Sequence, residues 1–169
     1  MTQAPFEMRT ARAADGAAML ALLQQVCAEG DTLPFVERVD ASLIDEVWLA
    51  AAGCMLALDP SDASVLGMYR LGSNMPGRGA HIASATYLVA ANARGKGIGR
   101  ALVADSLLKA TALGFRGMQF NQVVAGNVAA VALYESMGFA VTGRTPGGFR
   151  DDRSGFVDTL IMFRPLGAA

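Results

Sequence analysis

The amino-acid sequence predicts an α/β fold in which helices flank one mixed sheet. Segments with strand character alternate with segments of helical periodicity, and near the middle of the chain an apolar strand runs through a glycine-rich loop into a helix. The chain has 169 residues, which is enough for one domain with a substantial core. We therefore expect residues 1–169 to form a single domain.

A strand and a helix are expected at the N-terminus. Residues 6–10 predict the strand, and the helix that follows opens near Asp15 and ends at the Glu29-Gly30-Asp31 run. Its apolar stripe has helical spacing and consists of Met19, Leu22, Leu23, Val26 and Cys27.

The next elements are expected to be short. In chain order they are a connector at residues 32–35, a helix at 41–51, two hairpin strands at 54–58 and 64–71, a loop at 72–79 and a strand at 81–90. Gly53 stops the helix, and Pro60-Ser61-Asp62 supplies the hairpin turn.

The second half of the chain again alternates helix and strand. The expected elements are a helix at residues 97–113, a strand at 117–124, a helix at 127–137 and strands at 140–143 and 155–163. Gly114 and Gly138 stand where helix caps are needed. The Pro146-Gly147-Gly148 run predicts a loop between the last two strands.

The loop Arg94-Gly95-Lys96-Gly97-Ile98-Gly99-Arg100 predicts a binding site for an anion, most simply a phosphate. Its glycines leave backbone N–H groups accessible, three cations flank them, and a helix N-terminus follows. Two familiar phosphate loops do not fit. A Walker A loop needs Ser or Thr where Gly97 stands, and a dinucleotide fingerprint needs a glycine where Arg100 stands.

The pattern Arg94-x-x-Gly97-x-Gly99 resembles the Gln/Arg-x-x-Gly-x-Gly/Ala loop of the GNAT superfamily of acetyl-CoA-dependent N-acetyltransferases. Val89 matches the strand residue before that loop. Residues 127–139 resemble a second family segment, Asn-x-x-Ala-x-x-Leu-Tyr-x-x-x-Gly-Phe. The two motifs occur in the family's order, and the resemblance extends over most of the chain.

This resemblance implies a GNAT fold, with a mixed, mostly antiparallel sheet and acetyl-CoA as cosubstrate between the fourth and fifth strands. It implies that the backbone N–H of Val89 polarises the thioester carbonyl and that Tyr134 is the general acid for the leaving thiolate. The residues that it assigns to cofactor binding are Leu88, Val89, Arg94, Gly95, Lys96, Gly97, Ile98, Gly99, Arg100, Asn127 and Tyr134.

Several of these residues also have purely structural interpretations. Gly97 and Gly99 could serve helix–strand packing, Asn127 could be only an N-cap, and Tyr134 could be a core residue. The single histidine, His81, is more simply structural than catalytic. Trp48 is expected in the core.

The acceptor is expected to be a small, amino-acid-like amine, because the fourth and fifth strands carry neutral polar residues instead of clustered carboxylates. Expected substrate-binding residues are Ser84, Tyr87, Asn121 and Glu29. Residues 74–81 and 120–127 also resemble a GNAT subgroup that includes fungal acetyltransferases of proline analogues, although that subgroup usually has Asn where Ser84 stands.

The general base is left open by the sequence. Glu29, His81, Asp151 and Asp152 are candidates because they titrate and lie near loops, and a water relay or an amine that arrives deprotonated would serve equally. Two other functions also stay open. The chain could acetylate a protein N-terminus or lysine, or it could be a GNAT module that binds CoA without turnover.

Composition narrows the remaining partners. A net charge of −1 gives no basic face for nucleic acid, and the longest apolar run, residues 47–58, is too short to cross a bilayer. Cys27 and Cys54 lie far apart in apolar surroundings and, with one histidine, offer no metal site. No signal peptide is visible, so we expect a cytoplasmic protein without metal, and a homodimer stays open.

Overall fold

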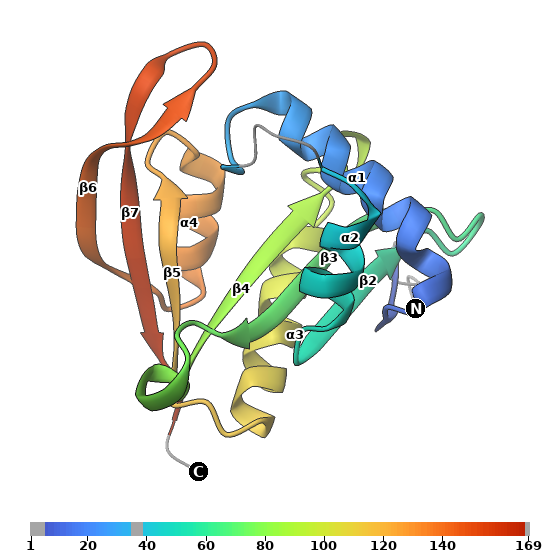
Figure 1. The fold of residues 1–169 in the computed structure, drawn as a ribbon, viewed down its shortest axis with the longest axis horizontal. Helices are drawn as coiled ribbons and strands as arrows, with labels where there is room; N and C mark the ends of the chain where they lie inside the picture. The colour runs from blue at the N-terminus through green and yellow to red at the C-terminus, as the bar shows by residue number, and fades with distance from the viewer. Residues whose placement is uncertain (1–5, 35–38, 168–169) are drawn as a thin grey trace.

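The computed structural model describes residues 6–34 and 39–167. It is built around a seven-stranded sheet with the order β1-β2-β3-β4-β5-β7-β6 (Figure 1). The strands are β1 (Glu7–Thr10), β2 (Gly53–Leu58), β3 (Val65–Ser73), β4 (Ile82–Val89), β5 (Gly117–Val124), β6 (Ala140–Asp151) and β7 (Gly155–Pro165). Only β4 and β5 pair in parallel, and all other neighbours are antiparallel. The expected mixed, mostly antiparallel sheet flanked by helices is therefore confirmed.

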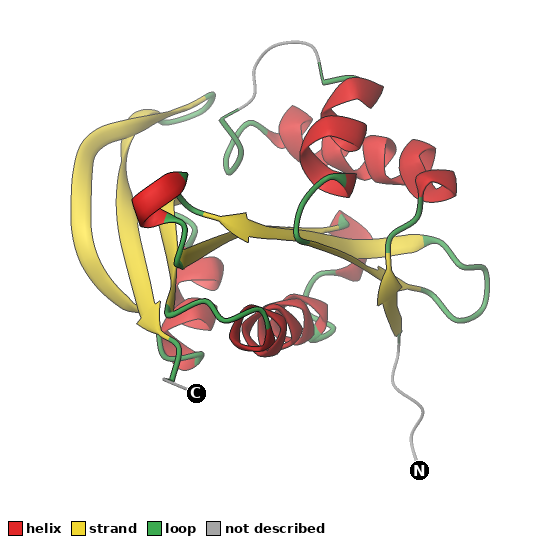
Figure 2. Ribbon diagram, turned by 60° about the horizontal axis from the view of Figure 1, so that its bottom comes forward, coloured by secondary structure: helices red, strands yellow, loops and turns green. Residues whose placement is uncertain are grey.

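Helices cover both faces of the sheet. A 3₁₀ turn at Ala13–Asp15 leads into α1 (Gly16–Glu29), which packs on β3 and β4 beside α2 (Ala41–Leu43). On the opposite face lie α3 (Ile98–Ala112) and α4 (Val128–Ser136), as Figure 2 shows. Short 3₁₀ turns at Gly77–Gly79 and Ala91–Ala93 flank β4.

The core follows the periodicity of the sequence. Four residues of the expected α1 stripe are buried, and Cys27, the fifth, is half-buried. Trp48 is 2% exposed, which confirms its core assignment. The opposite face of the sheet is sealed by α3, whose Ile98, Leu102 and Val103 are also buried.

The expected helix at residues 41–51 forms differently. Three α-helical residues are followed by a π-helical segment at Ile44–Leu49, and Gly53 already belongs to β2. Ile44 and Trp48 are the buried residues of this segment, whereas the expected inward residues Leu43 and Val47 are half-buried and Ala50 is exposed, because the π-helical turn changes which side chains face the sheet. Residue 35, the last of the expected connector, lies outside the described residues.

The expected loop at residues 146–148 is wrong. These residues form a bulge inside β6, because the pairing with β7 moves from Thr145↔Thr159 directly to Phe149↔Val157. The N–H of Gly147 donates to the carboxylate of Asp158 at 2.9 Å. The backbone N–H that the bulge leaves unpaired thus has a hydrogen-bond partner on the neighbouring strand. The strand β6 continues to Asp151 before the chain turns.

The strands β4 and β5 separate shortly after they begin. Their pairing is limited to Ile82↔Gly117 and Ala83↔Met118, and beyond these residues the two strands diverge (Figure 1). The divergence leaves one edge of β4 without a strand partner just before the glycine-rich loop. This edge is where the sequence motifs meet.

Candidate functional site

Val89 presents its backbone N–H toward the divergence of β4 and β5. In an antiparallel pair, residues alternate between positions that bond to the partner strand and positions that point away from it. The N–H of Ala90 donates to the carbonyl of Leu66 on the β3 side at 2.9 Å, and Gly67 pairs with Val89 one position along. The N–H and carbonyl of Val89 therefore point away from β3, toward the side where β5 has separated.

The glycine-rich loop has the backbone conformation that its sequence predicts. Gly95 and Gly97 have φ values of +75° and +81°, which side-chain-bearing residues rarely adopt. A Cβ atom at either position would meet no heavy atom within 4 Å. The loop is therefore open above its glycines, and a ligand can approach the backbone at the start of α3.

Two of the three cations in this region hold neighbouring elements. Arg94 pairs with Glu29 of α1, with Nη2 and Oε2 2.5 Å apart, and its Nε lies 3.4 Å from the carbonyl of Val89. Arg100 donates from α3 to the hydroxyl of Ser136 on α4 at 2.9 Å. Lys96 is exposed. The loop is thereby tied to both helical layers.

Tyr134 lies in an aromatic cluster on the α3/α4 face of the sheet. Its ring centroid is 4.6 Å from that of Phe120, 5.9 Å from that of Phe139 and 6.1 Å from that of Tyr87. Burial raises the pKa of its phenol to about 12. Within the described part of the chain its hydroxyl makes no hydrogen bond, so a protonated donor stands beside the β4–β5 divergence.

Asn127 caps α4. Its side-chain oxygen accepts from the N–H of Ala130 at 3.1 Å, which confirms the N-cap interpretation of this residue. Leu88 and Ile98, two other expected cofactor residues, are buried at 2% and 1% exposure. Their side chains belong to the core, so only their backbone could contact a cofactor.

The expected acceptor residues divide between the two faces of the sheet. Asn121 is exposed and lies with Gln122 in a bulge of β5, where two residues face Ile161. It donates to Asn74 at 2.6 Å and accepts from Gln119 at 2.8 Å. Ser84 lies on β4, paired with Gly72 of β3.

Tyr87 lies on the face opposite to Ser84. Side chains three positions apart along a strand point to opposite faces, and the hydroxyl of Tyr87 lies 2.7 Å from that of Ser106 on α3. Burial raises the pKa of this phenol as well. The structure therefore groups Tyr87 with Tyr134 rather than with Ser84 and Asn121.

The candidates for the general base are also separated. His81 is exposed, and it lies at the start of β4, whereas the glycine-rich loop follows the end of that strand. Asp151 accepts from the N–H groups of Arg153 and Ser154 in the β6–β7 turn, and these hydrogen bonds lower its pKa. Glu29 is paired with Arg94. Asp152 alone of these candidates lines a cavity.

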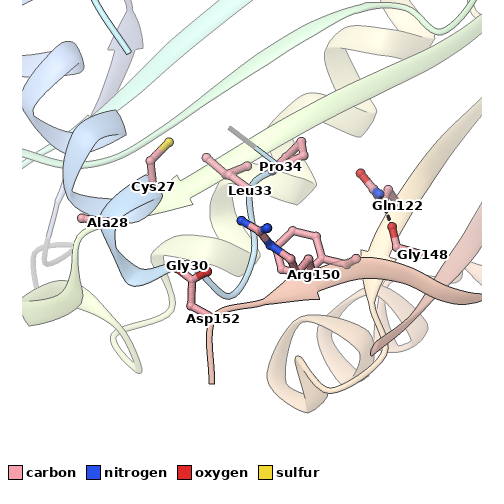
Figure 3. A pocket seen from close by; sticks show the side chains of 10 residues that line it. Cys27, Ala28, Gly30, Leu33, Pro34, Gln122, Gly148, Arg150 and Asp152 are labelled. Carbon is pink, nitrogen blue, oxygen red and sulfur yellow. Dashed lines mark hydrogen bonds between the residues drawn. The ribbon is translucent and has the colours of Figure 1, made fainter. Parts of the chain in front are cut away.

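That cavity, of about 620 Å³, lies between the end of α1, β5 and the end of β6 (Figure 3). Its walls are Cys27, Ala28, Gly30, Leu33, Pro34, Gln122, Gly148, Phe149, Arg150 and Asp152. Gln122 donates to the carbonyl of Gly148 at 2.8 Å and joins β5 to β6. Arg150 and Gln122 were not identified from the sequence, because only the fold brings β5 and β6 to the end of α1.

Asp31 was also not identified from the sequence. One of its carboxylate oxygens is buried and has no hydrogen-bond partner, and the residue stands between the cavity residues Gly30 and Leu33. A buried oxygen without a partner is uncommon. No local motif marks this residue, so sequence reasoning had no signal for it.

Metal ligands and membrane-spanning helices are both absent from the described residues. Residues 6–34 and 39–167 contain no group of three or more His, Cys, Asp or Glu side chains that could hold a metal ion. None of the described helices is long and apolar enough to cross a membrane.

Comparison with known proteins identifies the family. The model of the acetyltransferase (GNAT) family matches residues 20–139. N-acetyltransferase aca1 from Schizosaccharomyces pombe is 36% identical over 99 residues, which are 58% of this chain and 47% of that protein. The chain thus spans less than half the length of this curated relative.

Solved structures agree in fold. A GCN5-related N-acetyltransferase from Kribbella flavida is 37% identical, with a TM-score of 0.90 over 96% of this chain and 98% of that one. A GNAT phosphinothricin acetyltransferase from Sinorhizobium meliloti, solved with acetyl-CoA, is 23% identical, with a TM-score of 0.88 over 96% and 89% of the two chains.

The site geometry fits acetyl-CoA as ligand. The open glycine backbone suits a pyrophosphate, and the hydroxyl of Tyr134 has no protein partner among the described residues. Because the family match spans both sequence motifs and most of the sheet, the chain belongs to the GNAT family of acetyltransferases.

Proposed function

We propose that this protein transfers the acetyl group of acetyl-CoA to a primary or secondary amine of a small, amino-acid-like molecule, by direct attack in a ternary complex. One observation carries the proposal. The N–H of Val89 points to the side on which β5 has separated from β4, and Tyr134, whose hydroxyl makes no hydrogen bond to the described residues, packs against Tyr87 of β4 and Phe120 of β5. A donor for a developing oxyanion and an acid for a leaving group are the two groups that acyl transfer needs.

The glycine-rich loop holds the pyrophosphate in this proposal. Backbone N–H groups from Arg94 to Gly99, with the N-terminus of α3 behind them, supply the donors, and Lys96 and Arg100 add positive charge. Arg94 contributes mainly by its ion pair with Glu29, which fixes the loop against α1. Leu88, Ile98 and Asn127 shape the binding surface from behind.

Each chemical role falls to a group of the chain. Val89 stabilises negative charge on the acetyl oxygen while the amine nitrogen bonds to the acetyl carbon and the carbon–sulfur bond breaks. Tyr134 gives its proton to the departing sulfur, and the nitrogen loses one proton to solvent or to a carboxylate. Holding both reactants at the β4–β5 opening makes the attack effectively intramolecular, which is expected to contribute more than the acid.

A small polar acceptor is supported by the groups that surround the opening. Asn74, Gln119 and Asn121 form a neutral amide cluster on β5 and the β3–β4 connection, and Ser84 adds a hydroxyl on β4. Amides and hydroxyls suit the hydrogen-bonding groups of an amino-acid-like molecule better than a polycation. The cavity at the end of α1 is large enough for such a molecule.

The proposal also includes a single domain and a cytoplasmic location, and it leaves open whether the protein forms a homodimer. The location rests on the two cysteines, which are free thiols in the structure. A protein N-terminus or lysine as acceptor, or CoA binding without turnover, are the competing functions.

A panel of amines assayed for release of CoA from acetyl-CoA tests the proposal. The panel contains amino acids, amino-acid amides, polyamines, an aminoglycoside and a lysine-bearing peptide, each run with the wild type and with Tyr134→Phe. Fastest release with the amino acids, lowered in the variant, supports the proposal. Release only with the peptide would favour a protein acceptor, and no release with any amine despite CoA binding would indicate a non-catalytic module.

A further inference from the structure

The cavity at the end of α1 lies next to the cofactor loop. Glu29, which pairs with Arg94, immediately precedes Gly30 of the cavity wall. A molecule that contacts Gly30 in the cavity is therefore next to Glu29, whose ion pair with Arg94 fixes the loop. An acceptor bound in this cavity would therefore lie close to the cofactor loop.

The cavity wall contains two charged residues, and they are not paired with each other. The backbone N–H of Asp152 lies 3.5 Å from the carbonyl of Gly30, and its carboxylate covers that glycine so closely that a Cβ there would lie 2.5 Å from Oδ2. Arg150 makes no side-chain hydrogen bond or ion pair to any residue in the described ranges. Figure 3 shows its guanidinium among the side chains that line the cavity.

The other cations near this end of the sheet have partners or lie elsewhere. Arg144 pairs with Asp158 at 3.4 Å, and Arg94 pairs with Glu29. Arg153 belongs to the β6–β7 turn and does not line the cavity. Arg150 is thus a positive charge that faces the cavity and is free to bind an anion.

The rest of the wall restricts the size and type of that anion. Leu33, Pro34, Phe149 and Ala28 are apolar, and Gln122 already donates to Gly148. A planar guanidinium binds a carboxylate through two parallel hydrogen bonds. The wall therefore suits a short molecule with one carboxylate and a small apolar body.

We propose that Arg150 binds the carboxylate of the acceptor and thereby selects amino acids over amines that lack a carboxylate. This inference rests on the proposed function and names the residue that determines specificity. In this proposal Arg150 affects binding of the acceptor, whereas Val89 and Tyr134 act in the transfer of the acetyl group.

The test compares each amino acid with its own amide, using L-alanine, L-methionine and L-proline and the three corresponding amides. Calorimetry measures binding to the full-length protein saturated with CoA, so no transfer is needed. Initial rates with acetyl-CoA are measured in parallel. The variants are Arg150→Gln, Arg150→Lys, which keeps the charge, and Arg153→Gln, which removes an equal charge outside the cavity.

The wild type should bind at least one amino acid about 10-fold more tightly than its amide. Arg150→Gln should lower the affinity for that amino acid about 10-fold and should change the affinity for its amide less than about twofold. Arg150→Lys should retain part of the preference, and Arg153→Gln all of it. Equal binding of amino acids and amides, equal losses for both in Arg150→Gln, or no binding at all overturns the inference. Failure of the proposed function is seen separately, as absence of CoA release with every amine.

Discussion

Tyr134 combines a half-buried, closely packed ring with a hydroxyl that has no partner in the described residues. Phe120 and Phe139 fix the ring, so the direction of the hydroxyl is set by packing alone. The hydroxyl is reached by solvent and makes no hydrogen bond to the described residues, so it is open to a ligand. The neighbouring Tyr87 shows this contrast, since its hydroxyl is bonded to Ser106.

Tyr134→Phe should lower kcat by about 10²-fold, the lower end of the range for general acid catalysis. A free thiol has a pKa of about 8.5, so a thiolate can leave slowly without an acid. Affinity for CoA should be nearly unchanged, because the ring still packs. Measurements must be made where chemistry limits the rate, and a wild-type kcat in the variant would return Tyr134 to a core role.

The raised pKa of Tyr134 also fixes the expected pH dependence. Burial disfavours the phenolate and raises the pKa to about 12, so the acid form is present throughout the range used for assays. The rate should therefore rise with pH as the amine deprotonates, with no fall that depends on Tyr134 below about pH 10.

Asn121→Ala should raise KM for the amine by about 2- to 10-fold, as expected for the loss of one hydrogen bond. Because Asn121 is exposed, the free energy of unfolding should change by no more than about 0.5 kcal/mol. Asn74→Ala removes the same contact between side chains but keeps the amide of Asn121, so it separates loss of this contact from loss of the Asn121 amide. If both variants keep the wild-type KM, the amide cluster has no role in acceptor binding.

The glycine-rich loop acts at the scale of an element, because its backbone and the first turn of α3 form one surface. Gly97→Val should weaken CoA binding by at least about 10-fold. The new side chain is strained at a φ of +81° and occupies the space above the loop. Calorimetric titration with CoA measures the effect.

Gly114→Val is the control for this strain. Gly114 follows the other end of α3 and has a φ of +82°, and a Cβ atom there would likewise meet no heavy atom within 4 Å. Both variants should lose similar thermal stability, and only Gly97→Val should lose affinity for CoA. Equal CoA affinities in the two variants would exclude the loop from the binding site.

The sequence predicted elements well where nearby residues determine the secondary structure. It predicted them poorly where contacts with a distant segment determine it. The strand at residues 117–124 and the cap at Asn127 follow from periodicity and side-chain chemistry alone. The bulge at residues 146–148 was predicted as a loop, since proline and glycine break strands unless another strand supplies partners. Here Asp158 on β7 supplies one.

At the scale of the whole molecule, the proposed site combines the two sequence motifs with the divergence of β4 from β5. The residues proposed for the cofactor lie in two local motifs, Val89 to Arg100 and Asn127 to Tyr134, so the sequence could suggest them. The proposed acceptor side could not be predicted, because Cys27, Gln122 and Arg150 of the cavity come from three distant segments that only the folded chain brings together. Contacts between such distant segments cannot be inferred from the local sequence.

Direct transfer requires that acetyl-CoA and the amine occupy the β4–β5 opening together. Initial rates measured with both concentrations varied, using the best amine of the panel, test this requirement. Double-reciprocal plots should give lines that intersect, as for a ternary complex, and incubation with acetyl-CoA alone should leave no acetyl group on the protein. Parallel lines together with an acetylated protein would show transfer through a covalent intermediate and would contradict direct attack.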